Sequence, residues 1–224
     1  MLDKSVNYDD MLKKRIKDLE EKEKNTEQAI LNAAEKEFLD KGFDAAKTTM
    51  IASLAGVTHA MLHYYFRTKE NLFNMVFDKK LNLLKDSIFG LFDNQELSFI
   101  EQVQKSIEIH FDFLRANPGL PRFVINELLF KPKRMALFEK KIRKEGSHIL
   151  NNMRKEIDTE VKRGTIVSID PVHLLVDVAS LNVFVFVAMP LLTHFAVTPF
   201  GNEEAFLESR KKENVEIIMR RLKK

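Results

Sequence analysis

The sequence has no cysteine, and it contains only 7 glycines and 6 prolines in 224 residues. Without cysteine there is no disulfide framework, no cysteine-ligated zinc or iron–sulfur site and no thiol nucleophile. The lack also fits a reducing compartment, so we expect a cytoplasmic protein. Few glycines and prolines suit long helices and argue against a barrel or sandwich of many short strands.

Signals for secretion, membranes and catalysis are also missing. The charged N-terminus has no apolar region of a signal peptide. The most apolar stretch, Leu174–Phe200, is interrupted by polar residues and proline, whereas a spanning helix needs about 20 mostly apolar residues. We therefore expect a buried helix there and no membrane association. The net charge of +3 is too small to indicate nucleic acid by itself.

The chain contains no glycine-rich phosphate loop, no HExxH and no GxSxG, so we expect no enzyme. His59 and His63 have the spacing of two zinc ligands on one helical face, but no third histidine or carboxylate follows at a ligand spacing. We therefore expect neither a metal nor a cofactor.

Helical periodicity runs through nearly the whole chain and predicts an all-α fold. Expected helix starts carry capping residues, and expected ends carry glycine or an Asn-Pro pair. The predicted starts are Asn25, Thr48 or Thr49, Thr58, Thr68, Ser98, Pro121, Pro132, Pro171 and Asn202. Val183 to Val187 alternates like a strand, but a single strand would have no partner.

A helix-turn-helix pattern lies between Thr48 and Phe66. Ala52 is small where two helices would cross, and Gly56 supplies the positive φ of a tight turn. The small core between the two helices is expected to contain Ile51, Val57 and Leu62. The second helix would then present its polar and aromatic face to a DNA major groove.

Tyrosine, histidine and lysine side chains can donate hydrogen bonds to phosphate oxygens, and helix N-termini attract anions. Base reading would fall to the start of the second helix, through hydrogen bonds and thymine-methyl contacts. The residues predicted to contact DNA are Thr48, Thr49, Thr58, His59, Ala60, Met61, His63, Tyr64 and Lys69. Tyr64 could equally be an ordinary exposed tyrosine.

This region resembles the DNA-binding part of the tetracycline-repressor (TetR) family of bacterial transcription factors. The resemblance covers about residues 25–76, about a quarter of the chain. Its motifs are IL-x-AA at 30–34, Phe38, GF at 42–43, IA-xx-AGV at 51–57 and L-xx-YF-xx-KE-x-L at 62–72. It implies a homodimeric regulator, usually a repressor that a small ligand releases from palindromic operator DNA. The chain departs from the family pattern at His63, Ala46 and Lys47.

Three segments are therefore expected: a charged extension over 1–24, a helix-turn-helix DNA-binding domain over 25–70, and a ligand-binding and dimerisation domain over 71–224. We expect the extension to be a frayed or extended helix, and its basic residues could reach DNA phosphates or could form a solvated face. A helical adaptor that binds only protein is the alternative to a DNA-binding regulator, but it leaves the helix-turn-helix surface unexplained.

Polar residues recur among apolar faces in the C-terminal part, and an apolar cavity with a few polar groups is the usual small-molecule site. A partly apolar effector is expected to contact His110, Phe113, Asn126, Glu127, Phe130, His148, Asn182 and Phe186. Each polar member of this set could instead be a satisfied core residue.

Two C-terminal helices carry the apolar residues that predict a homodimer. The helix that begins at Asp170 is apolar on nearly all sides, so other helices must cover nearly all of its surface. Pairing both helices with their copies about a two-fold axis would form a four-helix bundle. The predicted interface residues are Leu174, Val178, Leu181, Val185, Val215, Ile218, Met219 and Leu222.

Overall fold

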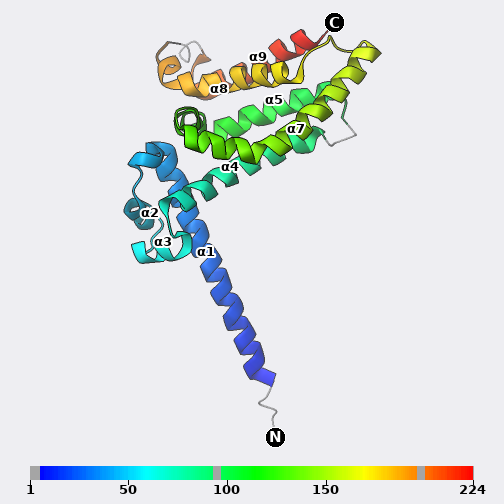
Figure 1. Cartoon of the computed structure of the whole chain (residues 1–224). Helices are drawn as coiled ribbons and strands as arrows, with labels where there is room; N and C mark the ends of the chain where they lie inside the picture. Colours follow the sequence, from blue (N-terminus) through cyan, green and yellow to red (C-terminus); the bar gives the residue numbers. More distant parts are fainter. Residues whose placement is uncertain (1–5, 93–96, 196–199, 224) are drawn as a thin grey trace. The chain divides into compact units, whose positions relative to one another are not determined.

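The computed structural model describes residues 6–92, 97–195 and 200–223, and these ranges contain helices and no β-strand (Figure 1). The predicted all-α fold is therefore correct. The helices are α1 (Val6–Ala45), α2 (Thr48–Leu54), α3 (His59–Phe66), α4 (Lys69–Phe92), α5 (Phe99–Ala116), α6 (Leu120–Val124), the π-helical turn η1 (Ile125–Leu129), α7 (Pro132–Arg163), α8 (Pro171–Phe195) and α9 (Glu203–Leu222). Residues 196–199 of the apolar C-terminal stretch lie outside the described ranges.

The chain divides into two compact units, Met1–Lys79 and Lys80–Lys224. We call them the head and the body. The division falls inside α4, which begins in the head, whereas the sequence placed a boundary between residues 70 and 71. Each unit has a core of its own.

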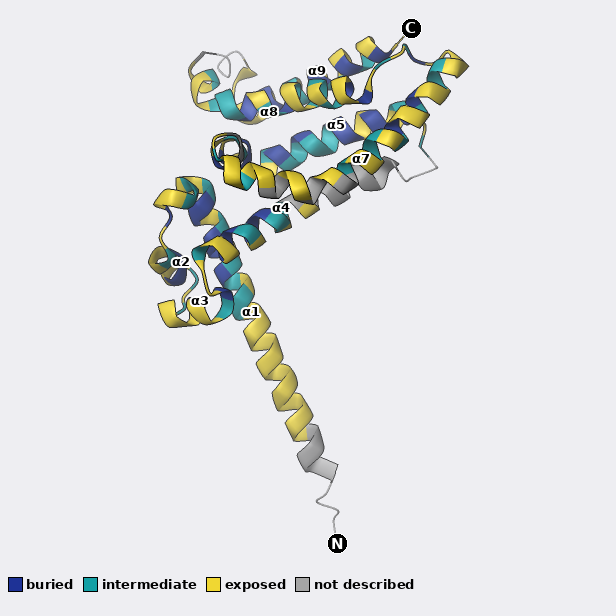
Figure 2. Cartoon of the chain, viewed as in Figure 1, coloured by how far each residue is buried: buried dark blue, intermediate teal, exposed yellow. Residues whose placement is uncertain are grey.

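The expected helical extension and the expected first helix form one continuous helix. α1 continues from Val6 through Asn25, so the expected start at Asn25 is wrong. The reason is that residues 6–41 contain no glycine or proline, and Lys, Glu and Leu, which favour helices, dominate the stretch. Gly42 interrupts α1 as predicted, with φ 73° and ψ 173°. Residues 11–25 are exposed along their whole length (Figure 2).

Most other helix ends lie where local chemistry placed them. Thr58 accepts a hydrogen bond from Met61 N, Ser98 and Glu101 form a complete capping box, and Asn202 caps α9 through Ala205 N. The start of α2 differs, because the N-cap is Lys47 and its side chain makes no capping bond. Residues 183–187 are helical, not extended.

The head closes around aromatic side chains from three places in the sequence. Phe73 of α4 makes edge contacts with Phe38 at 5.3 Å and with Phe43 at 5.1 Å between ring centroids. Ile51, Ala52 and Leu62 are buried as predicted. Val57 is half-buried between α2 and α3. The helix-turn-helix is thus held by packing onto α1 and α4.

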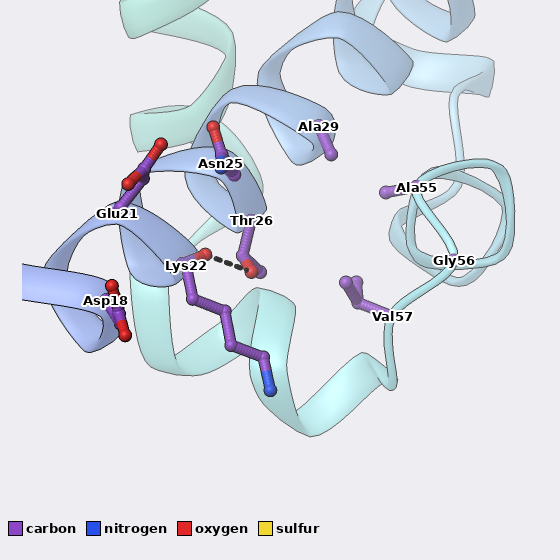
Figure 3. Close-up of a pocket in the computed structure, with 9 residues that line it drawn as sticks. All are labelled: Asp18, Glu21, Lys22, Asn25, Thr26, Ala29, Ala55, Gly56 and Val57. Atoms are coloured by element: carbon purple, nitrogen blue, oxygen red, sulfur yellow. Dashed lines mark hydrogen bonds between the residues drawn. The ribbon is translucent and has the colours of Figure 1, made fainter. Parts of the chain in front are cut away.

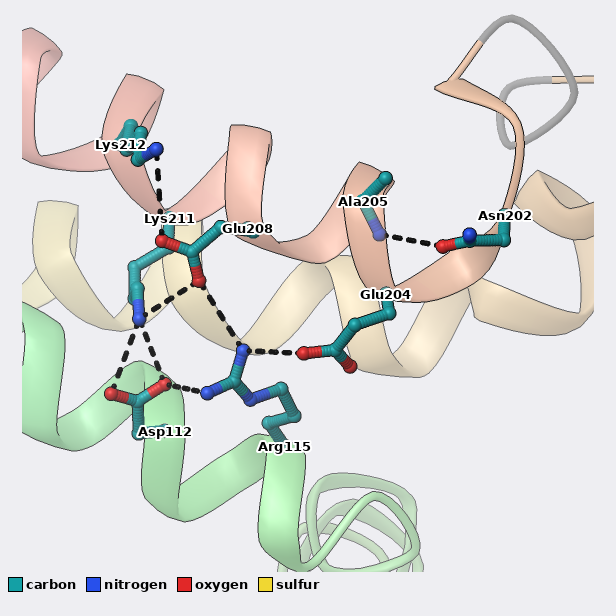
Figure 4. A network of polar contacts seen from close by, with 8 residues as sticks. All are labelled: Asp112, Arg115, Asn202, Glu204, Ala205, Glu208, Lys211 and Lys212. Atoms are coloured by element: carbon teal, nitrogen blue, oxygen red, sulfur yellow. Dashed lines mark hydrogen bonds and ion pairs between the residues drawn. The ribbon is translucent and has the colours of Figure 1, made fainter.

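In the body, α5 packs against α7, α8 and α9. One core joins these helices through residues such as Ile107, Met153, Leu174 and Ile218. At the edge of the α5–α9 contact, Lys211 pairs with Asp112 at 3.1 Å and with Glu208 at 3.1 Å (Figure 4). Burial alone would lower the pKa of Lys211, but these carboxylates outweigh it and raise that pKa above its usual value.

The turn between α2 and α3 requires its glycine. Gly56 has φ 67°, while Gly56 N donates to Ser53 O and Val57 N donates to Ala52 O, which is the Schellman pattern of a helix end. No heavy atom lies within 4 Å of a Cβ built at Gly56, so space is not the constraint.

We expect Gly56→Ala to lower the free energy of unfolding of the head by about 1–2 kcal/mol, because an alanine is strained at this φ. Gly56→Asn should cost less, because asparagine adopts left-handed conformations more readily. Chemical denaturation of the full chain, with the head transition followed separately, measures both. An alanine variant as stable as the wild type would contradict the backbone argument.

Candidate DNA-binding surface and effector cavity

Helix α3 presents the side chains that the sequence assigned to DNA. Its residues His59, Ala60, Met61, His63 and Tyr64 are all exposed, and Tyr64 is 65% accessible. The remaining residues of the predicted set are exposed (Thr49, Thr58) or half-buried (Thr48, Lys69). The head therefore gathers the nine predicted residues at one end of α2, along α3 and at the start of α4.

The two histidines of α3 are held by neighbouring groups. His59 Nε2 lies 2.9 Å from Thr48 Oγ1 and so links α3 to α2. His63 Nδ1 lies 3.0 Å from the carbonyl oxygen of Arg67, and a carbonyl only accepts, so Nδ1 carries a proton. In its neutral form His63 then has an acceptor at Nε2, and it can donate there to a phosphate only when protonated.

Lys69 is more engaged than the sequence suggested. Its Nζ donates to Asp44 O at 3.3 Å and lies 4.7 Å from the centroid of the Phe43 ring. Burial acts to raise the pKa of Glu37. Hydrogen bonds from Lys41 and Lys47 N and the positive charges of Lys41 and Lys69 together lower that pKa below its usual value. Lys69 therefore stabilises the join between α1 and α4 as well as adding positive charge.

The predicted set of DNA contacts left out two basic residues at the rim of this surface: Arg67, and Lys47, which was named only as a departure from the family pattern. Both are exposed, and Arg67 lies just past the end of α3, with φ 59° and its guanidinium carbon 6.0 Å from the Tyr64 ring centroid. Arg67 could have been found as a cation one position beyond α3, but a pattern matched to α3 alone does not include it. Such a cation can contact a phosphate beside a groove-bound helix.

A groove of about 470 Å³ runs between the exposed part of α1 and the helix-turn-helix turn (Figure 3). Its walls come from Asp18 to Ala29 on one side and from Ala55, Gly56 and Val57 on the other. Thr26 Oγ1 donates to Lys22 O at 2.8 Å within the α1 wall. The groove contains charges of both signs, so it indicates no single class of ligand.

The body contains a cavity of about 320 Å³ between α5, α7 and α8. Its described lining is almost wholly apolar and carries no formal charge at neutral pH. The lining residues are Val103, Ser106, His110, Gly146, Ile149, Leu150, Met153, Leu174, Leu175, Val178 and Ala179. A mostly apolar cavity with few polar groups is the usual form of a small-molecule site.

Of the residues predicted to contact a ligand, His110 lines this cavity. Asn182 does not line it, but its Nδ2 lies 3.3 Å from His110 Nδ1. The others lie elsewhere. Phe130 is 71% exposed, Asn126 and His148 are also exposed, and Glu127 is buried in an ion pair with Arg134. Phe186 is buried, and Phe113 packs beside it in a separate cluster. These six were chosen for their residue type, but neighbouring helices decided their surroundings.

Burial lowers the pKa of His110 to about 4, so its ring is neutral at physiological pH. Its Nδ1 faces the side-chain amide of Asn182, which is fully buried and also contacts Asn214 of α9 at 2.9 Å. The cavity histidine is therefore linked to both C-terminal helices.

The residues predicted for a dimer interface lie mainly inside one chain. Leu174, Val185, Ile218 and Leu222 are buried in the single-chain core. Val178, Leu181, Val215 and Met219 are half-buried, and all but Val185 belong to or pack against one cluster. The outward apolar side of α8 consists of other residues: Val172, Val176, Phe184 and Leu191.

Helix α8 over Pro171–His194 is, by length and composition, apolar enough to cross a membrane, and only 22% of its most apolar window is buried in the single chain. Such a helix is weak evidence for a membrane, because core helices pass the same test. In one chain alone the helix is only partly buried, because one apolar side remains exposed, and the expected covering of that side depends on the predicted second copy.

Residues 30–76 match the family model described as "Bacterial regulatory proteins, tetR family". This match places residues 30–76 of the chain in the TetR family. The matched residues contain α2, α3 and the hydrophobic contacts that hold them, so the match falls on the helix-turn-helix of the head.

Relatives of known sequence fit this TetR-family assignment. The nucleoid occlusion factor SlmA of Mannheimia succiniciproducens is 29% identical over 124 residues, which cover 52% of this chain and 55% of SlmA. The HTH-type transcriptional regulator RutR of Escherichia coli K12 is 26% identical over 147 residues, 66% of this chain and 67% of RutR. The match thus spans about half of SlmA and two thirds of RutR.

Solved structures extend the likeness to most of the chain. HlyIIR, a hemolysin II transcriptional regulator, superposes with a TM-score of 0.63 at 20% identity and covers 90% of this chain and 99% of its own. The ketosteroid transcriptional regulator KstR2 of Mycobacterium tuberculosis gives 0.65 at 14% identity, with 88% and 95% covered. At these identities the likeness concerns the fold alone.

Proposed function

We propose that this TetR-family regulator is a cytoplasmic, homodimeric repressor that binds palindromic operator DNA through α3 and is released by a small molecule held in the body cavity. The single observation that carries the DNA-binding part is the exposed face of α3, flanked by Arg67 and Lys47, on a closed head. The effector part is supported by the apolar cavity between α5, α7 and α8. Among the residues that the structure describes, we find no feature that favours a protein-binding adaptor over this function.

Coupling between the two sites is proposed to use α4 and α5. α4 begins in the head at Lys69, and in the body its Lys80 donates to Asn117 Oδ1, just past the end of α5, at 2.6 Å. Because α5 also carries His110, an effector that shifts α5 can change the position of α4. Linkage requires the effector to bind the DNA-free state more tightly, by about 1–3 kcal/mol in typical cases.

Dimerisation is supported by the exposed apolar side of α8. A monomeric surface rarely leaves a contiguous row of large apolar side chains in water. A second copy of the same helix about a two-fold axis covers that row, and the two heads can then read half-sites one or more turns apart, at about 34–36 Å for one turn.

The DNA-binding test compares two neighbouring cations, Arg67 and Lys69. We expect Arg67→Ala to weaken binding to every duplex about equally and to flatten the salt dependence of binding by about one unit, as for one lost phosphate contact. Fluorescence anisotropy on duplexes selected from a random library with wild-type protein measures both. Unchanged affinity and salt slope would exclude the phosphate contact.

Lys69→Ala serves as the contrast. Because Lys69 also bonds Asp44 O and covers Phe43, its loss should lower the stability of the head by about 0.5–1.5 kcal/mol in addition to weakening DNA binding. Arg67→Ala should leave that stability unchanged. His59→Ala should instead change which base pairs are preferred, since it removes a group from the groove-facing side of α3.

A further inference from the structure

The polar end of the body cavity is built from one histidine and two buried amides. Asn182 and Asn214 have no exposed surface, and they lie on α8 and α9. Asn182 Nδ2 donates to Ile107 O at 2.9 Å and faces His110 Nδ1 at 3.3 Å. Asn214 Nδ2 donates to Leu181 O at 3.1 Å and to Asn182 Oδ1 at 2.9 Å.

The carbonyl oxygens decide the orientation of both amides. Ile107 O and Leu181 O can only accept, so the atoms that face them must be the NH2 groups of Asn182 and Asn214. Turning either amide over would set its oxygen against a buried carbonyl oxygen and leave both without a donor. The two hydrogens of Asn182 Nδ2 therefore go to Ile107 O and to His110.

These hydrogen bonds of Asn182 leave one possible tautomer for the neutral ring of His110. Because Asn182 presents a hydrogen to His110 Nδ1, that nitrogen must be the acceptor and carry no proton. A neutral ring then has its proton on Nε2. Nε2 bonds to no group that the structure describes, and it lies on the far side of the ring from Nδ1 while the ring lines the cavity.

The other side chains of the described lining offer few hydrogen-bonding groups to a ligand. The Ser106 hydroxyl already donates to Val103 O at 2.7 Å. The other described lining side chains are aliphatic or methionine, or are absent at Gly146. His110 Nε2–H is thus the hydrogen-bond donor that the described lining leaves free.

We infer that the effector is an uncharged, mainly apolar molecule with one hydrogen-bond acceptor, such as a ketone, ester or lactone oxygen, which receives the proton of His110 Nε2. This inference rests on the proposed role of the cavity as the effector site. A cation meets a donor and apolar walls, and a buried charge without a partner is strongly disfavoured. An anion can accept the same proton but finds no described counter-charge.

The tautomer is tested first, without any ligand. Long-range proton–nitrogen NMR of protein with 15N-labelled histidine distinguishes the two tautomers and the imidazolium. The His110 signals are assigned by their loss in His110→Gln. At pH 7.5 we expect His110 with its proton on Nε2. A proton on Nδ1, or on both nitrogens, would overturn the inference.

Ligand class is tested with four probes that share one carbon chain: octan-2-one, octane, octanoate and octylammonium. We expect octan-2-one to bind about tenfold more tightly than octane, the value of one hydrogen bond. Octylammonium should bind on the order of a hundredfold more weakly than the ketone, and octanoate should also bind more weakly. NMR titration of the cavity methyl groups measures all four.

Two variants separate the hydrogen bond from cavity shape. His110→Phe keeps a planar ring without a donor, so it should bind ketone and alkane about equally, whereas His110→Gln keeps a donor and should retain part of the ketone preference. An unchanged ketone preference in His110→Phe, tightest binding of an ion, or binding of none of the probes would each overturn the inference. Ketone binding that leaves operator affinity unchanged would instead contradict the proposed release mechanism and leave the ligand class intact.

Discussion

Replacing Val176 and Phe184 by glutamate should convert the protein to a folded monomer that has lost about a hundredfold or more of its operator affinity. Both residues are exposed on α8, and Phe184 is 67% accessible in the single chain. Together with Val172 and Leu191 they fall within an arc of about 120° around the helix, so they lie on one side of α8. Charges on that side leave the chain's own core intact.

The loss in affinity follows from linking two heads. A dimer binds its second half-site as an intramolecular event, and such linkage typically contributes a factor of 10²–10⁴. A monomer keeps only the affinity of one head. Sedimentation velocity measures the mass, and fluorescence anisotropy on a palindromic duplex selected with wild-type protein measures the affinity.

Two control variants make the dimer test specific. Asn151→Glu adds charge to an exposed position of α7 and should leave mass and affinity unchanged. Ile218→Lys should unfold the body, because Ile218 is 1% exposed and lies in the core of one chain. A Val176→Glu/Phe184→Glu protein that remains a dimer with intact operator binding would place the interface on another surface.

Filling the body cavity from Gly146 should abolish ligand-induced release while DNA binding persists. Gly146 lines the cavity, and no heavy atom lies within 4 Å of a Cβ built there. A leucine at this position can extend into the space of about 320 Å³ and occupy part of what a ligand needs. We expect Gly146→Leu to lower ligand affinity about a hundredfold, since overlap with a packed side chain cannot be relieved cheaply.

Gly146→Ala is the matched control. It adds one methyl group to the open space and replaces a glycine inside α7, so it should raise stability by about 0.5–1 kcal/mol and leave most of the cavity free. Operator release is measured by anisotropy with octan-2-one and with any compound that releases the wild type. Normal release of Gly146→Leu would mean that the effector binds elsewhere.

Local sequence determined the helix-turn-helix and most helix ends. Capping at Thr58, Ser98 and Asn202 and the positive φ at Gly56 depend on residues within a few positions of one another, so short-range patterns contain the information. The start of α1 was the exception. A good N-cap sequence at Asn25 competed with helix formers on both sides, and the continuous helix won.

Some features of the DNA-binding surface could likewise be predicted from local sequence, and others could not. Exposure of α3 could be predicted because the residues that pack beneath it, Leu62 and Phe66, lie on the same short helix. The contacts of Lys69 with Asp44 O and the Phe43 ring could not be predicted, because these partners are distant in the chain. They meet Lys69 only when α1 and α4 pack together. Arg67 was missed because it follows the helix to which the pattern applied.

Only the tertiary structure decided which side of α8 faces its own core and which polar residues share the cavity. α8 is apolar on nearly all sides, so its sequence has no periodicity that distinguishes Leu174, which is buried, from Val176, which is exposed. The contacts among His110, Asn182 and Asn214 join three helices that are far apart in the chain. The sequence by itself determined the all-α fold and the recognition helix, because these depend on neighbours along the chain. The cavity and the outward face depend on neighbours that only packing brings together.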